Sequence, residues 1–132
     1  MPGERGPADE EVDADRVAAA IQLFSPGRPV RLLGNGYGGF VALQAVIRPP
    51  GLADRLVLAD AGAAFSEPGR QAFRGMAGAA TAKGLDAIAD TAMRRLFAPD
   101  FHAAHPGLVS DRRRIFLASD PAVVVAACEA LA

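Results

Sequence analysis

Three glycines and one carboxylate have the types and spacing of a ligand-binding turn. Gly34, Gly36 and Gly39 lie between the apolar run 30–33 and a second apolar run, 40–47, so they satisfy G-x-G-x-x-G between a strand and a helix. Asp60 ends the following apolar segment, about 20 residues after the last glycine. In a dinucleotide site such glycines let the backbone approach a pyrophosphate, and the acid binds ribose hydroxyls. That fold also needs a third strand, and none is indicated after Asp60.

The same turn has a second interpretation, small-x-nucleophile-x-small, which is the nucleophile elbow of α/β-hydrolases. Segments 31–39, 41–45 and 56–60 (RLLGNGYGG, VALQA and LVLAD) resemble the elbow strand, the next helix and the next strand of the 3-oxoadipate enol-lactonase family. The stretches 96–101, 105–106 and 120–121, the last of them near Cys128, resemble the helical cap of that family. The resemblance implies a partial α/β-hydrolase fold, a parallel βαβ elbow unit followed by a mostly helical cap, and a small-molecule ester, lactone or carboxylate as ligand.

One position departs from the family pattern in a way that removes the chemistry. Gly36 stands where the family has its nucleophilic serine, and Asn35 stands where histidine is usual. The resemblance places the triad acid and histidine downstream of this segment. The backbone N–H of Tyr37 is then the one remaining oxyanion donor, and we expect its side chain at the pocket mouth. The expected elbow pocket consists of Gly34, Asn35, Gly36, Tyr37, Gly38 and Gly39.

We therefore predict a truncated, catalytically impaired relative of ester and lactone hydrolases, and the sequence leaves open whether the chain is an enzyme. A non-catalytic small-molecule binding or assembly protein on the same fold is one alternative. A dinucleotide-binding oxidoreductase fragment is another. Asp60 has three interpretations: a ribose ligand, a substitute triad acid, or a polar strand terminus, of which the last is the commonest.

The other chemically capable residues have structural interpretations. His102 and His105 fall on adjacent helical turns, but no nearby cysteine or glutamate completes a zinc site, so we expect no metal. Cys128 lies on an apolar helix and is expected to be a small buried hydrophobe. Met93 either packs in the cap or lines an acyl pocket beneath it, and Arg94 is expected to interact with a helix C-terminus. We expect no cofactor.

Periodicity and turn residues predict the elements that position these residues. We expect an amphipathic helix over 15–24, a strand over 30–33, a helix over 40–47, and a strand over 55–60 that is parallel to the first and buried on both faces. Helices are predicted over 67–83, 85–97 and 108–116, and from 121 onward. The predicted organisation is α/β: a disordered acidic tail, 1–13, a hydrolase core segment, 14–62, and a helical cap-like region, 63–132.

Two parallel strands do not make a self-sufficient sheet, because a parallel sheet needs both faces covered. Either the chain is part of a larger fold, or another chain or a second copy completes the sheet as a homo-oligomer.

Composition limits the class of protein. The 132 residues carry 14 basic and 15 acidic side chains, a formal charge of −1, and 51% of them are apolar, which is the balance of one globular domain. The near-neutral charge argues against a nucleic-acid partner, and the apolar runs are too short for a membrane span. The acidic N-terminus does not resemble a signal peptide, so we expect a cytoplasmic protein. A single cysteine cannot form an internal disulfide, so no oxidising compartment is implied.

Overall fold

The computed structural model describes residues 10–48 and 51–132, and these residues form seven helices and a two-stranded parallel sheet. In chain order the elements are α1 (Glu10–Phe24), β1 (Val30–Asn35), α2 (Tyr37–Ile47), β2 (Ala53–Ala59), α3 (Glu67–Lys83), α4 (Asp86–Leu96), α5 (Pro99–Ala104), α6 (Pro106–Leu117) and α7 (Pro121–Ala130). The predicted mixed α/β class and the parallel pairing of the two strands are confirmed.

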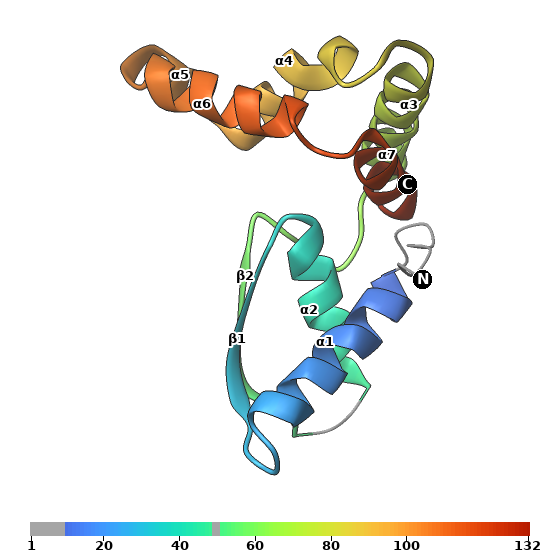
Figure 1. Ribbon diagram of the computed structural model, residues 1–132, viewed down its shortest axis with the longest axis vertical. Coiled ribbons are helices and arrows are strands. Elements are labelled where there is room, and N and C mark those ends of the chain that lie inside the picture. The colour runs from blue at the N-terminus through green and yellow to red at the C-terminus, as the bar shows by residue number, and fades with distance from the viewer. Residues whose placement is uncertain (1–9, 49–50) are drawn as a thin grey trace.

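Helices α1 and α2 form one layer against one face of the strands (Figure 1). Their shared core contains Ala14, Val41, Ala45 and Leu52, each buried, with Ile21 packed at the edge. Alanine at two of these positions lets the helices approach closely, and the branched chains supply the apolar area that drives burial. This layer fixes the direction of α2, and therefore the geometry of the turn that precedes it.

The opposite face of the sheet is open. Leu33 and Val57 pair directly across the two strands, and they remain 66% and 53% exposed. Arg31 and Arg55 form another paired couple that is also exposed. The prediction that the second strand is buried on both faces is therefore wrong, because a helical layer covers one face only in the described part of the chain.

Helix α1 begins earlier than predicted, so residues 10–13 are helical instead of part of a disordered tail, and residues 1–9 lie outside the described residues. Interactions with α2 account for the extension. Arg48 forms ion pairs with Glu11 at 2.7 Å and Asp15 at 3.3 Å. The Tyr37 hydroxyl donates a hydrogen bond to the Asp13 carboxylate at 3.0 Å. The acidic start of α1 is thus held along its length by side chains of α2 and the residue that follows it.

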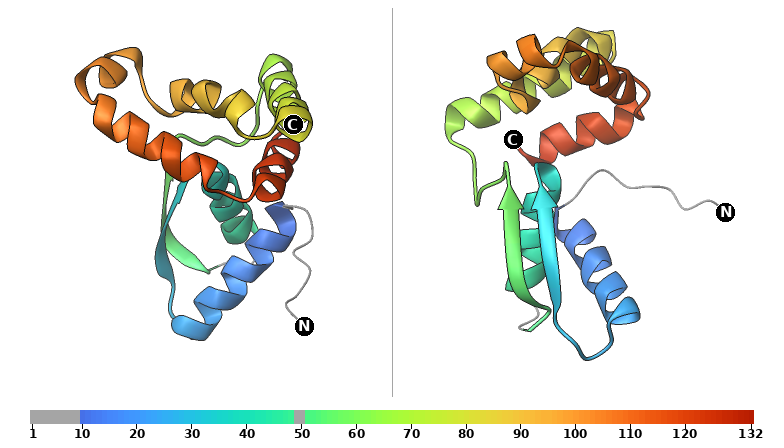
Figure 2. Two further views of the ribbon diagram at one scale, coloured as in Figure 1. Left: turned by 45° about the horizontal axis from the view of Figure 1, so that its top comes forward. Right: turned by 90° about the vertical axis from the view of Figure 1, so that its left-hand side faces the viewer.

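The remaining helices gather beyond the carboxyl ends of the strands, towards which both strand arrows point (Figure 2). Helix α3 packs against α4 and α7, and α6 packs against α4 and α5. Ala80, Leu85 and Ile88 form a buried cluster, with Phe116 and Leu117 packed against it. All four predicted helices of this region are confirmed, whereas the short helix α5 was not predicted. None of the helices in the described ranges is both long enough and apolar enough to cross a bilayer.

Phe65 connects the strand unit to the helical region. It lies in the segment between β2 and α3, with its ring centroid 5.1 Å from that of Phe40 in α2 and 4.9 Å from that of Phe73 in α3. Aromatic pairs at these separations attract by dispersion and by the quadrupoles of the rings. The three rings therefore anchor α3 close to the end of the sheet at which the glycine turn lies.

Candidate functional site

The glycine turn joins β1 to α2 through a single residue, Gly36. Its backbone has φ 54° and ψ −127°, a conformation that residues with a Cβ rarely adopt and that glycine adopts without a clash. The Gly39 N–H donates to the Gly36 carbonyl at 2.9 Å, which closes the first turn of the helix. The chain thus passes from strand to helix with no intervening loop, as the elbow interpretation requires.

One carbonyl of β2 holds the turn against the sheet. The Gly36 N–H donates to the Ala59 carbonyl at 3.1 Å, and the Asn35 side-chain amide donates to the same oxygen at 3.2 Å. Because Asn35 and Ala59 are the last registered pair, Gly36 and Asp60 follow next to each other at the carboxyl end of the sheet. Open parallel sheets bind their ligands at this end.

Close packing explains two further glycines of the turn. A Cβ on Gly34 would lie 2.6 Å from the Gly39 Cα and 2.8 Å from the Ala42 Cβ, well inside van der Waals contact. A Cβ on Gly39 would overlap that of Ala61. These glycines let β1, α2 and the segment after β2 approach one another. This is a structural role that does not depend on a ligand.

The space beside Gly36 is open. A Cβ placed on this residue would have no heavy atom within 4 Å, so a serine side chain here would project freely from the turn. The turn therefore has the form that presents the nucleophile in an elbow, but the residue that occupies it has no side chain. Glycine cannot form an acyl-enzyme, because it offers no hydroxyl or thiol to attack a carbonyl.

Tyr37 lies differently from the prediction. Its hydroxyl bonds to Asp13, and its ring packs with the core shared by α1 and α2, so the phenol does not lie over the turn. The expected position at a pocket mouth is therefore wrong. Its backbone N–H belongs to the first residue of α2, at the positive end of the helix dipole.

Asp60 is exposed and directly follows β2 with φ 50°, a left-handed conformation that aspartate tolerates better than most residues. This conformation turns the chain away from the sheet towards α3. The observed role fits a polar strand terminus, and Asp60 directly follows the Asn35–Ala59 pair after which Gly36 also lies.

The histidines and the cysteine belong to the helical region. The His102 Nε2–H donates to the Met93 carbonyl at 3.1 Å, and the His105 ring centroid lies 4.6 Å from that of Phe101. Within the described ranges no three His, Cys, Asp or Glu side chains are grouped to hold a metal ion. Cys128 is buried as predicted, and burial raises the pKa of its thiol, which keeps the sulfur protonated.

No protein-family model, curated protein or solved structure matches this chain.

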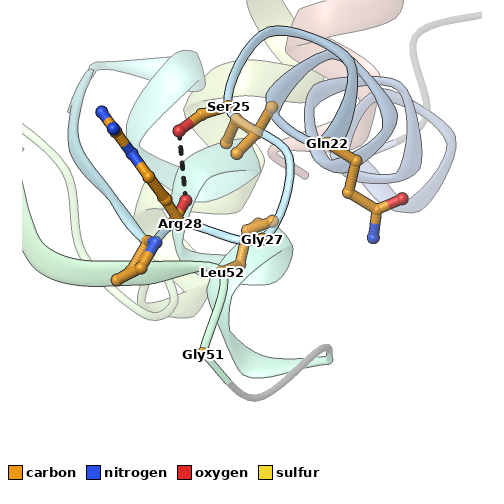
Figure 3. Close-up of a pocket in the computed structure, with 8 residues that line it drawn as sticks. Gln22, Ser25, Gly27, Arg28, Gly51 and Leu52 are labelled. Carbon is orange, nitrogen blue, oxygen red and sulfur yellow. Dashed lines mark hydrogen bonds between the residues drawn. The ribbon is translucent and has the colours of Figure 1, made fainter.

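A cavity of about 250 Å³ lies at the other end of the sheet, where α1 ends and the two strands begin (Figure 3). The Ser25 hydroxyl donates to the Arg28 carbonyl at 3.2 Å, so this polar group serves the loop. The Gln22 amide and the Arg28 guanidinium extend to opposite sides (Figure 3). Specific sites have polar groups that converge on a ligand, and these do not converge.

A larger cavity of about 630 Å³ lies among α4, α5 and α6. Sequence reasoning named Met93 as a lining residue of an acyl pocket but missed the others, because several of them belong to α5 or to the segment before it. The available signal was Pro99, since proline is favoured in the first turn of a helix.

Proposed function

We propose that this chain is a relative of the α/β-hydrolases, similar to the 3-oxoadipate enol-lactonases, that binds a small ester, lactone or carboxylate at its elbow without triad hydrolysis. The observation that carries the proposal is the backbone of Gly36, a positive-φ residue joining a parallel strand directly to a helix. A nucleophile elbow needs this conformation, and glycine at its centre leaves the conformation without the nucleophile.

The electrostatics of the turn suit an oxygen that carries partial or full negative charge. The first backbone N–H groups of a helix have no carbonyl partners within the helix, and the helix dipole gives this end a positive potential. Because the space beside Gly36 is open, an oxygen atom of a ligand can approach the first turn of α2 beside the Gly38 N–H, whereas the Gly39 N–H already donates to the Gly36 carbonyl. The same donors would hold an oxyanion in an active hydrolase.

Loss of the nucleophile predicts the kinetic behaviour. Removing the serine of a triad costs about 10⁶-fold in turnover, which leaves binding and oxyanion effects. We expect hydrolysis of p-nitrophenyl acetate to stay at the rate of buffer alone. Turnover well above buffer that is retained after repurification, and is abolished by Gly36→Val, would contradict the proposal.

Binding at the turn can be measured directly by amide chemical shifts in a ¹⁵N-labelled sample. Titration with γ-butyrolactone or acetate should shift the amides of Gly36, Gly38 and Gly39, and NAD should not. The Gly36→Val variant should lose these shifts. Gly27→Val is the matched control, because Gly27 also has positive φ, 69°, and open space around it, but lies before β1 at the other end of the sheet.

The result with NAD separates the two interpretations of the glycine pattern. Saturable shifts of the turn amides with NAD, and none with the lactone or the carboxylate, would favour the dinucleotide site. The chain after Asp60 argues against that outcome, since it continues into helix α3 and contributes no third strand in the described residues.

Assembly is a second candidate function, favoured by the open face of the sheet. Leu33 and Val57 present an apolar pair there, and a second chain that covers them would remove apolar surface from water. Thermal unfolding followed by circular dichroism at two protein concentrations tests this candidate, because the midpoint of an assembled protein rises with concentration. An invariant midpoint would exclude an assembly that stabilises the fold.

A further inference from the structure

The cavity among α4, α5 and α6 is independent of the glycine turn. Its volume of about 630 Å³ lies within the range of about 300–1,000 Å³ that is typical of small-molecule sites. The residues that line it come from α4, α5, α6 and the short connection before α5, and none comes from the turn: Asp90, Met93, Arg94, Phe97, Pro99, His102, Val109 and Arg113.

One side of the cavity is apolar and well fixed. Met93 is 2% exposed, and Val109 and Phe97 are half-buried. The Phe97 ring stacks on that of Phe101, with centroids 4.9 Å apart and an interplanar angle of 10°. These contacts hold the wall in place before any ligand arrives, which lowers the entropic cost of binding.

His102 forms part of the same wall. Its Nε2–H is engaged by the Met93 carbonyl at 3.1 Å, and its ring stands edge-on to Phe97 with centroids 6.1 Å apart. The bond ties α5 back to α4 and so keeps the cavity from collapsing. The imidazole therefore has a structural role here.

The two arginines at the cavity differ in their partners. Arg113 is neutralised, with Asp90 at 3.0 Å and Asp86 at 3.6 Å. Arg94 is exposed and donates to the Thr91 hydroxyl at 3.3 Å, and no ion pair joins it to a carboxylate among the described residues. An apolar wall therefore stands beside a guanidinium that forms no ion pair in the described residues, while Asp90 in the same lining is paired with Arg113.

We propose that this cavity binds a small amphipathic carboxylate, with its hydrocarbon chain against Phe97 and Val109, above the buried Met93, and its carboxylate on Arg94. Burial of the chain supplies apolar stabilisation, and the planar guanidinium can donate two parallel hydrogen bonds to a carboxylate. The site does not depend on the function proposed for the turn.

Calorimetric titration with octanoate tests the proposal, with acetate and octanamide as comparison ligands. Octanoate should bind saturably, acetate should not bind to this cavity, and octanamide should bind about tenfold more weakly, the loss expected for one charge-assisted contact. Absence of octanoate binding to the folded protein at millimolar concentration would overturn the proposal.

Variants locate the ligand. Arg94→Gln should weaken octanoate binding about tenfold, whereas Arg112→Gln, which removes the same charge from an exposed position of α6 outside the cavity, should leave it unchanged. Val109→Phe should reduce binding by filling the cavity. Equal effects of the two arginine variants would overturn the assignment of the carboxylate.

Gly36→Val separates this site from the turn. Octanoate binding at the turn should disappear in that variant, and the octanoate binding that Arg94→Gln weakens should persist. If all binding were lost, octanoate would occupy the turn, which would overturn the cavity proposal and support the function proposed for the turn.

Discussion

Alanine substitutions at three glycines of one turn should have three different effects on stability, because each glycine meets a different environment. At Gly34 the new Cβ would lie 2.6 Å and 2.8 Å from its neighbours, about 1 Å short of ordinary carbon contact. The nearest of these neighbours belong to the backbone of the turn and cannot rotate away. We expect Gly34→Ala to lower the free energy of unfolding by about 3 kcal/mol, the upper end of the usual cost of overpacking.

Gly36 and Gly38 provide the comparison. At Gly36 the added methyl group meets nothing within 4 Å, so the cost is conformational, about 1–3 kcal/mol for an L-residue held at φ 54° and ψ −127°. Gly38 also has open space, but it lies inside α2 in an ordinary helical conformation. Gly38→Ala should therefore be neutral or stabilise the protein by up to about 1 kcal/mol.

Urea unfolding followed by circular dichroism measures all three variants, with the slope of the transition used to check that the unfolded states are comparable. The expected order of destabilisation is Gly34→Ala, then Gly36→Ala, then Gly38→Ala. The described turn geometry would be refuted if Gly38→Ala lowered the free energy of unfolding as much as Gly34→Ala does. It would also be refuted if Gly36→Ala left the free energy of unfolding unchanged.

Three further predictions concern the helical region. Asp120→Ala should cost about 1 kcal/mol in urea unfolding, because the Asp120 carboxylate accepts a hydrogen bond of 2.9 Å from a backbone N–H at the start of α7; no loss would show that the cap is not formed. Hydrogen bonds from Arg70 and then Arg74 lower the pKa of Glu67, so its ionised form favours the folded state. This stabilisation of the folded state is complete at a pH above the ordinary glutamate pKa of about 4.3, and it is lost as the pH falls through the lower pKa of the folded protein. In the Glu67→Gln variant, the free energy of unfolding should therefore depend less on pH in this acidic range. Burial raises the pKa of the Cys128 thiol, so iodoacetamide should label it slowly in buffer and rapidly in urea; equal rates would place the sulfur at the surface.

Local sequence patterns predicted most of the elements. Helix α2 ends at Ile47 as predicted but begins three residues earlier, at Tyr37, and α7 begins at Pro121 as predicted. Short segments gave less information, and α5, with six residues, is too short for a helical period to emerge.

Contacts between distant residues could not be predicted from local pattern. The extension of α1 depends on Arg48 and Tyr37, which lie beyond the intervening strand in sequence. The exposure of Val57 depends on which segments cover the sheet, and an apolar run does not reveal this. The turn could be predicted because Gly34, Gly36 and Gly39 lie within one short segment of the sequence. The cavity beside Arg94 could not, because it forms only where three helices meet.

The exposed arginine pair on the open face has a consequence for how copies of the chain meet in solution. Arg31 and Arg55 are registered neighbours, and two copies stacked through this face would bring four guanidinium groups close together beside the apolar pair. Charges placed in this way are a common device against unwanted sheet association. Salt weakens such repulsion, since the screening length falls from about 10 Å at 0.1 M to about 3 Å at 1 M. We therefore expect stacking through this face, and burial of the apolar pair, to be more favourable at high ionic strength than at low.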